Sequence, residues 1–105
     1  MAAQKWAALA RRVGRQYAAM VREQPTVESL WYSTEDDGVE LWLVTAPSNI
    51  ATTRRLWART GSLLNQFPDA DIRLHVLNRR NYPSVNLDVM LPEGARLITR
   101  FANAG

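Results

Sequence analysis

The fold is decided by residues 27–45, which read VESLWYSTEDDGVELWLVT. Two runs rich in β-branched, aromatic and aliphatic residues, 27–34 and 39–45, flank a short acidic stretch. Asp37-Gly38 suits a tight turn because glycine readily adopts positive φ. The neighbouring carboxylates are explained by this turn and need no cation site. The stretch therefore predicts a β-hairpin.

An amphipathic helix precedes the hairpin, over residues 5–23. Its end is set by Gln24, because a residue before proline disfavours the α conformation. Gly14 lies within it, where glycine marks close packing or a kink. Apolar and basic side chains fall on opposite sides of this helix. The apolar positions are Trp6, Leu9, Val13, Tyr17 and Met20, and the basic ones are Lys5, Arg11, Arg12, Arg15 and Arg22.

A second amphipathic helix is predicted over residues 50–67, with Ser48 or Asn49 as its N-cap and Pro68 as its stop. One side of this helix is apolar and is expected to pack, and its arginines point away. The apolar side consists of Ile50, Leu56, Trp57, Leu63, Leu64 and Phe67, and the arginines are Arg54, Arg55 and Arg59.

A third strand is predicted over residues 71–78, where apolar and polar residues alternate. Alternation at Val85, Leu87, Val89 and Leu91, followed by a turn and residues 95–101, predicts one more strand or two short ones. The order α-β-β-α-β-(β) indicates an α+β fold. We expect a single domain over residues 1–105, a two-layer sandwich with two amphipathic helices packed on a small, mainly antiparallel sheet.

Both faces of the hairpin are apolar, so the face away from the helices also needs cover. The side chains concerned are Trp31, Tyr32 and Trp42. A homodimer or a protein partner would cover them, and so would a C-terminal segment folded back over the sheet. The sequence favours neither alternative.

Composition limits the class of protein. Basic residues exceed acidic ones by 13 to 10, and no cysteine is present, which excludes disulfides and thiolate metal sites. Arginines interrupt the N-terminal apolar residues, and no stretch approaches the ~20 apolar residues of a membrane span. We expect a cytoplasmic protein without membrane association.

Arginine supplies all but one of the basic residues. Its planar fork of donors suits phosphate, and the loop around Arg79 and Arg80 adds amides and a stacking ring. A nucleic-acid-binding module is therefore one hypothesis. Its candidate residues are Arg11, Arg15, Arg22, Arg79, Arg80 and Tyr82.

Chemistry-bearing residues are sparse. His75 is the only histidine, so an enzyme would use it for proton transfer with Asp69, Asp71 or Asp88. No second imidazole or thiolate exists to share a metal ion, and no cofactor motif occurs. The sequence favours a small non-catalytic interaction protein, an accessory subunit or antitoxin-like partner that acts through Trp31 and its aromatic neighbours.

Overall fold

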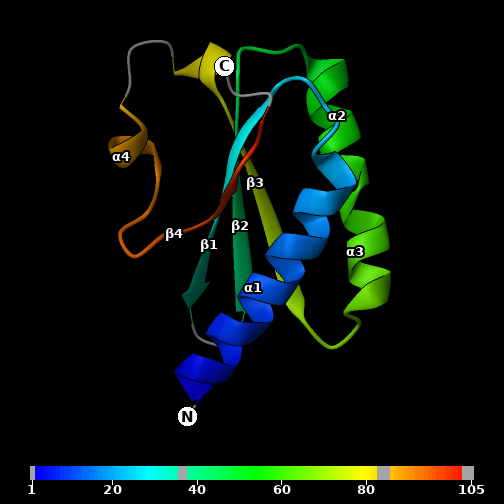
Figure 1. The fold of residues 1–105 in the computed structure, drawn as a ribbon, viewed down its shortest axis with the longest axis vertical. Coiled ribbons are helices and arrows are strands. Elements are labelled where there is room, and N and C mark those ends of the chain that lie inside the picture. Colours follow the sequence, from blue (N-terminus) through cyan, green and yellow to red (C-terminus); the bar gives the residue numbers. More distant parts are fainter. Residues whose placement is uncertain (1, 36–37, 83–85, 103–105) are drawn as a thin grey trace.

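The computed structural model describes residues 2–35, 38–82 and 86–102, and it has the expected α+β fold (Figure 1). The strand order in its sheet is β3-β2-β1-β4. β1 is antiparallel to β2 and β4, and β2 is parallel to β3. The elements are α1 (Ala2–Val21), β1 (Val27–Glu35), β2 (Gly38–Thr45), α2 (Ile50–Ala58), α3 (Thr60–Gln66), β3 (Asp71–Asn78), the 3₁₀ turn η1 (Arg79–Asn81), α4 (Leu87–Met90) and β4 (Arg96–Arg100).

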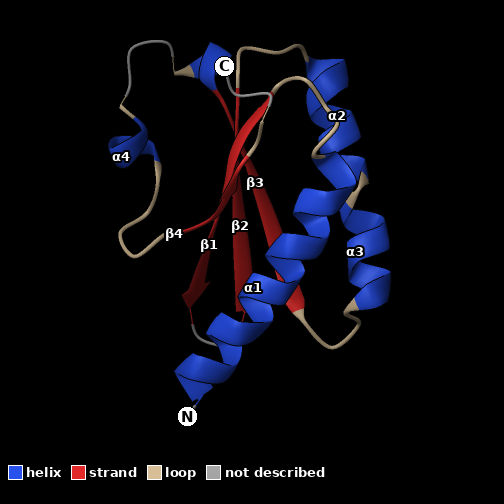
Figure 2. Cartoon of the chain, in the orientation of Figure 1, coloured by secondary structure: helices blue, strands red, loops and turns tan. Residues whose placement is uncertain are grey.

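Three helices form one layer and the sheet forms the other. Figure 2 shows α1, α2 and α3 together on one side of the sheet, with α4 apart from them. The core lies between these layers, because each helix buries one stripe and each strand buries alternate residues there. Its fully buried members include Val13, Tyr17, Val21, Leu30, Val39, Leu41, Leu43, Leu56 and Leu63.

The hairpin and the third strand are confirmed. β1 and β2 pair in register from Glu35 opposite Gly38 to Val27 opposite Thr45, with one irregularity near Ser29. The parallel β3 follows because α2 and α3 carry the chain back along the sheet, a crossover that a two-residue turn cannot make.

The helix expected over residues 50–67 is divided in two. α2 ends at Ala58 and α3 begins at Thr60, and the two continue one another along the same side of the sheet (Figure 1). The Thr60 hydroxyl donates a 2.6 Å hydrogen bond to the carbonyl of Trp57, which competes locally with regular helical bonding. Asn49 is the N-cap, since its side chain accepts from the Thr52 amide.

The packing side predicted for this helix was partly wrong. Leu56 and Leu63 are fully buried, but Ile50, Trp57 and Leu64 are 68%, 46% and 44% exposed. Trp57 and Leu64 directly follow the buried Leu56 and Leu63, so a 100° turn carries them beyond the sheet, and Ile50 is the first residue of α2.

The alternating segment before residue 92 is wrong as a strand. Val85 lies outside the described residues, and Leu87–Met90 forms the helical turn α4. The amides of Val89 and Met90 donate to the carbonyl of Asn86, a local pattern that needs no neighbouring strand. The final strand is confirmed as β4, after a turn in which Gly94 adopts φ 88°.

Candidate functional site

A row of four side chains crosses the face of the sheet that is turned away from α1–α3. Leu97 on β4 lies opposite Trp31 on β1, Trp31 lies opposite Trp42 on β2, and Trp42 lies opposite His75 on β3. Except for Arg96, their neighbours along each strand belong to or pack against the core, so the row points the other way. We call these four residues the open-face row.

Both tryptophans of the row have their polar atoms satisfied. The indole Nε1 of Trp31 donates to Ser29 Oγ at 2.9 Å, and that of Trp42 donates to Ser33 Oγ at 2.9 Å. The two rings are half-buried, and Leu97 beside them is 41% exposed. The row thus presents apolar surface whose buried donors are already paired.

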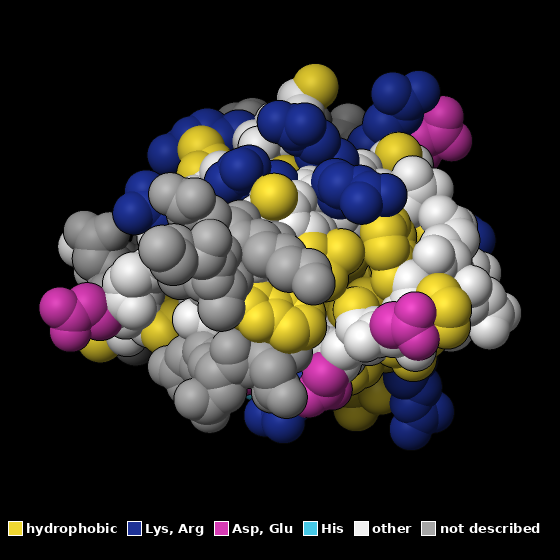
Figure 3. Space-filling model, turned by 90° about the horizontal axis from the view of Figure 1, so that it is seen from below, with side chains coloured by type: hydrophobic (Ala, Val, Ile, Leu, Met, Phe, Trp, Pro, Cys, Tyr) yellow, Lys and Arg dark blue, Asp and Glu magenta, His cyan; other side chains and the backbone are white. Residues whose placement is uncertain are grey.

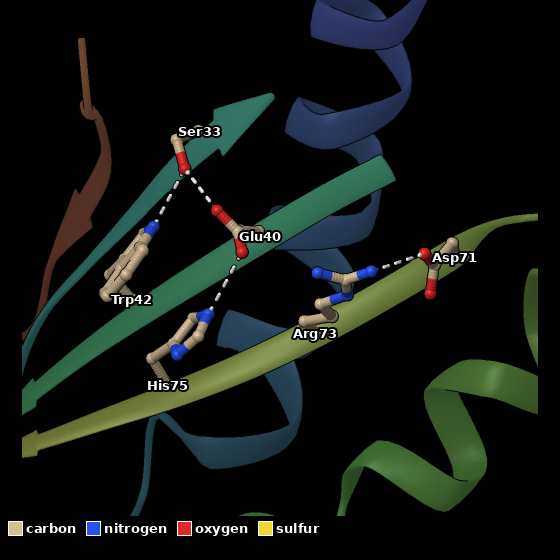
Figure 4. A network of polar contacts seen from close by, with 6 residues as sticks. All are labelled: Ser33, Glu40, Trp42, Asp71, Arg73 and His75. Atoms are coloured by element: carbon tan, nitrogen blue, oxygen red, sulfur yellow. Dashed lines mark hydrogen bonds and ion pairs between the residues drawn. The ribbon is translucent and has the colours of Figure 1, made fainter. Parts of the chain in front are cut away.

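The β3 end of the row carries a polar network (Figure 4). The rings of Trp42 and His75 are stacked, with centroids 3.9 Å apart and an interplanar angle of 11°. His75 Nε2 lies 3.3 Å from Glu40 Oε1, and the Ser33 hydroxyl donates to Glu40 Oε2 at 3.3 Å. When His75 is protonated, it forms an ion pair with Glu40.

A second ion pair lies farther along β3 (Figure 4). Arg73 Nη2 is 3.4 Å from Asp71 Oδ2, and both side chains are mostly exposed. A surface pair of this kind contributes at most about 1 kcal/mol to folding because water screens it. The Asp71 carboxylate therefore partly neutralises the charge of Arg73 at the edge of the sheet.

The network does not join a nucleophile to a base. Glu40 stands between the Ser33 hydroxyl and His75, whereas nucleophilic catalysis needs the hydroxyl to donate directly to its base. The carboxylate beside His75 is Glu40, and neither Asp69 nor Asp71 hydrogen-bonds to His75. Asp69 lines a separate hollow with Trp6, and the side chain of Asp88 lies outside the described part.

Tyr32 belongs elsewhere. It was expected beside Trp31 and Trp42, but it is 5% exposed and packs in the core on the helix side of the sheet. Its hydroxyl accepts a 3.5 Å hydrogen bond from Arg11 Nη1. Alternation along β1 puts Tyr32 opposite in direction to Trp31, so it is not part of the open face.

Part of the open face is already covered. Val44 and Leu77, which alternate with Trp42 and His75 two positions away, are buried without belonging to the core under the helices. Figure 1 shows η1 at one end of the sheet and α4 beside the sheet, apart from α1–α3. Leu97 on the same face stays exposed, so the cover is partial.

The candidate nucleic-acid residues fall in separate places. Arg79 Nε donates to both carboxylate oxygens of Glu28, at 3.0 and 3.1 Å, so its guanidinium is engaged within the fold. Arg80 and Tyr82 are exposed beyond β3. Arg11 is exposed on α1 and reaches Tyr32. The six residues therefore do not form one surface.

Two of them do converge with a third arginine that the sequence analysis missed. Arg15 and Arg22 on α1 and Arg100 on β4 line a hollow of about 500 Å³, floored by Ile98 and Phe101. Among the described residues, no aspartate or glutamate lines this hollow. In the view of Figure 3, Lys and Arg side chains gather along one border of the molecule, above a hydrophobic area. Arg100 gave no signal in the sequence because only the pairing of β4 with β1 places it beside α1.

The described residues contain no group of three or more histidines, cysteines or carboxylates that could hold a metal ion. Among them, no helix has the combined length and apolarity required to cross a membrane. Comparisons with protein-family models, curated proteins and solved structures find no significant match.

Proposed function

We propose that this chain is a non-catalytic interaction protein that binds another protein through the open-face row. The observation that carries the proposal is the continuity of Leu97, Trp31, Trp42 and His75 across all four strands. Aromatic residues are enriched in protein interfaces because they bury a large area with few rotatable bonds. A protein partner or a second copy would provide the missing cover.

The row is also pre-organised for binding. The hydrogen bonds to Ser29 and Ser33 fix the two indoles, and the stack on His75 fixes Trp42 again. A partner would then lose little side-chain entropy on the surface it covers. A cytoplasmic location is part of this proposal, and the absence of cysteine is consistent with it.

The test is site-specific photo-crosslinking. A photoreactive amino acid replaces Leu97 in one variant and Gln16, an exposed residue on α1, in another. Irradiation in the native host should give one discrete protein adduct from position 97, resistant to nuclease, and none from position 16. Leu97→Asp protein without the photoreactive residue, added as a competitor, should reduce this adduct less than the unaltered chain does. Equal adducts from both positions would contradict the proposal. Size-exclusion chromatography of the purified chain then shows whether the partner is a second copy or another protein.

A second candidate function is nucleic-acid binding, and the hollow formed by Arg15, Arg22 and Arg100 favours it. Converging guanidinium groups attract phosphate, and this attraction weakens steeply with salt. Affinity for single-stranded and duplex oligonucleotides should fall as salt rises, and Arg15→Gln and Arg100→Gln should each reduce the slope by about one. Arg55→Gln, on the outer face of α2, is the matched control. Absence of binding at low salt excludes this candidate.

A further inference from the structure

A second apolar surface lies on the helix layer, and only His75 of the open-face row borders it. Ile50, Trp57 and Leu64 follow one another at intervals of seven, which aligns them along α2 and α3. All three are exposed, Ile50 most of all. Contiguous exposed apolar side chains on a small domain mark a binding surface.

This stripe faces the free edge of the sheet. One hollow of about 500 Å³ is lined by Ile50 and Trp57 together with Val76 of β3. A second of about 370 Å³ is lined by Trp57 and Leu64 together with Ile72 of β3. Trp57 stands between the two hollows, which we call together the edge groove.

The strand beside the edge groove has one free side. β3 pairs only with β2 among the described strands, because it is the terminal strand of the order β3-β2-β1-β4. Half of the backbone donors and acceptors of an edge strand point away from the sheet and can pair with an added strand. A segment added there would lie beneath the stripe, since both hollows are bounded by β3 and by the helices. Strand addition supplies main-chain hydrogen bonds, and apolar pockets select alternate side chains.

The positive charge of the edge groove indicates which kind of segment it binds. Arg54 and Arg80 line the first hollow and Arg73 lines the second, whereas no aspartate or glutamate of the described part of the chain lines either. Two described carboxylates lie near them. Asp71 partly offsets Arg73 through an exposed 3.4 Å contact, and Glu40, opposite Arg73 on β2, lies 3.3 Å from His75 of the second hollow. Pairing two β3 edges in a homodimer would bring the same arginines together, and like charges across an interface are unfavourable.

We propose that the edge groove binds an acidic, extended segment of a partner protein, which adds to β3 as a fifth strand and inserts apolar side chains beside Trp57. Its carboxylates lie against Arg54, Arg73 and Arg80. This inference goes beyond the open-face row, and each surface can be tested while the other is intact.

The probe is an eight-residue capped peptide that repeats Glu-Glu-Val-Val, so that each face of the added strand carries both residue types, compared with a peptide in which lysine replaces glutamate. Binding is measured by anisotropy of the labelled peptide, and backbone pairing by slowed amide exchange in β3. The acidic peptide should bind and protect β3 amides, and the basic peptide should not. Arg54→Glu should weaken binding about tenfold by reversing one charge of the groove.

Matched controls separate the groove from general charge and apolarity. Arg55→Glu changes the adjacent arginine, which lines neither hollow, and should leave the affinity within about twofold. Ile50→Ser should weaken binding, whereas Val89→Ser, at an exposed residue of α4, should not. Leu97→Asp, on the open-face row, should also leave peptide affinity unchanged.

Four outcomes of the peptide experiments would overturn the inference. These are equal binding of both peptides, equal effects of Arg54→Glu and Arg55→Glu, binding without protection of β3, and no binding of the acidic peptide at about 1 mM. Protection of β3 in the protein alone, increasing with its concentration, would identify a second copy as the occupant and would also overturn it. The exchange measurement uses the unaltered chain, so it does not depend on the folding of any variant.

Discussion

His75 stacks face to face on Trp42, with the ring centroids 3.9 Å apart and the planes inclined by 11°. The same imidazole lies 3.3 Å from Glu40 Oε1. One side chain of β3 therefore contacts two side chains of β2 on the open face. This is the parallel pair of the sheet, which no tight turn joins, so side-chain contacts help to hold the register.

His75→Ala should lower the free energy of unfolding by about 1 kcal/mol, because it removes the stacked ring and leaves Glu40 without this partner. Urea denaturation followed by circular dichroism measures the change. Arg73→Ala, two residues away with an exposed ion pair, should change stability by less than about 0.5 kcal/mol. Equal effects of the two substitutions would show that the stack contributes nothing specific.

The two helical glycines should respond in opposite directions to alanine. A Cβ at Gly14 would lie 2.8 Å from Ile98 Cδ1 and 2.9 Å from its Cγ1, so Ile98 must move. Gly14→Ala should destabilise the fold by about 1 kcal/mol, since overpacking outweighs the gain in helix propensity. Around Gly61 nothing lies within 4 Å of the added Cβ, and Gly61→Ala should stabilise by about 0.5–1 kcal/mol. Thermal unfolding of both variants tests these two predictions. Stabilisation by both substitutions would mean that Ile98 moves without an energetic cost.

Asn78 should be the most sensitive polar residue outside the open-face row. Its Oδ1 accepts from the amides of Ser48 and Arg80 at 3.1 and 3.0 Å, and its Nδ2 donates to the Ser48 carbonyl at 2.8 Å. Asn78 is buried, so Asn78→Ala should cost about 2–3 kcal/mol by leaving these groups unpaired.

Asn78→Asp keeps the two accepted bonds and loses the donated one. The free energy of unfolding of Asn78→Asp, measured by urea denaturation, should therefore lie between those of the wild type and Asn78→Ala. A larger loss in Asn78→Asp than in Asn78→Ala would contradict the assignment of Oδ1 as the main contact.

Tyr17 should make the fold sensitive to alkaline pH. Its hydroxyl donates to the Leu56 carbonyl at 2.8 Å, and burial raises the pKa of the phenol above its usual range, with Arg59 opposing that shift. The unfolded phenol ionises near pH ~10 while the folded one stays neutral, so stability is retained below that pH and is lost as pH rises beyond it.

Tyr17→Phe should lower stability by about 1 kcal/mol at pH 7 and make its decline above pH ~10 shallower. Denaturation curves at pH 7 to 11 measure both effects. Tyr82→Phe, at an exposed ring, is the control. An unchanged alkaline slope in Tyr17→Phe would show that another group causes the decline.

Local patterns predicted most of the fold. The hairpin, β3 and the N-cap at Asn49 depend on residues close in sequence, and all three are confirmed. Alternation around Leu87 failed as a strand signal because a strand also needs an edge to pair with, and that segment forms its own hydrogen bonds at Asn86. Trp57 failed as a core residue because the sheet is too narrow to cover the whole apolar side of the helix.

The candidate surfaces depended on pairing across the sheet. The sequence by itself determined the amphipathic helices, the strands and their order, because 3.6- and 2-residue periodicities are properties of neighbouring residues. Only the tertiary structure decided that Trp31 and Trp42 form a row with His75 and Leu97 while Tyr32 enters the core. It also decided that β3 is a free edge beside Trp57, because strand order and register join residues that the chain keeps far apart.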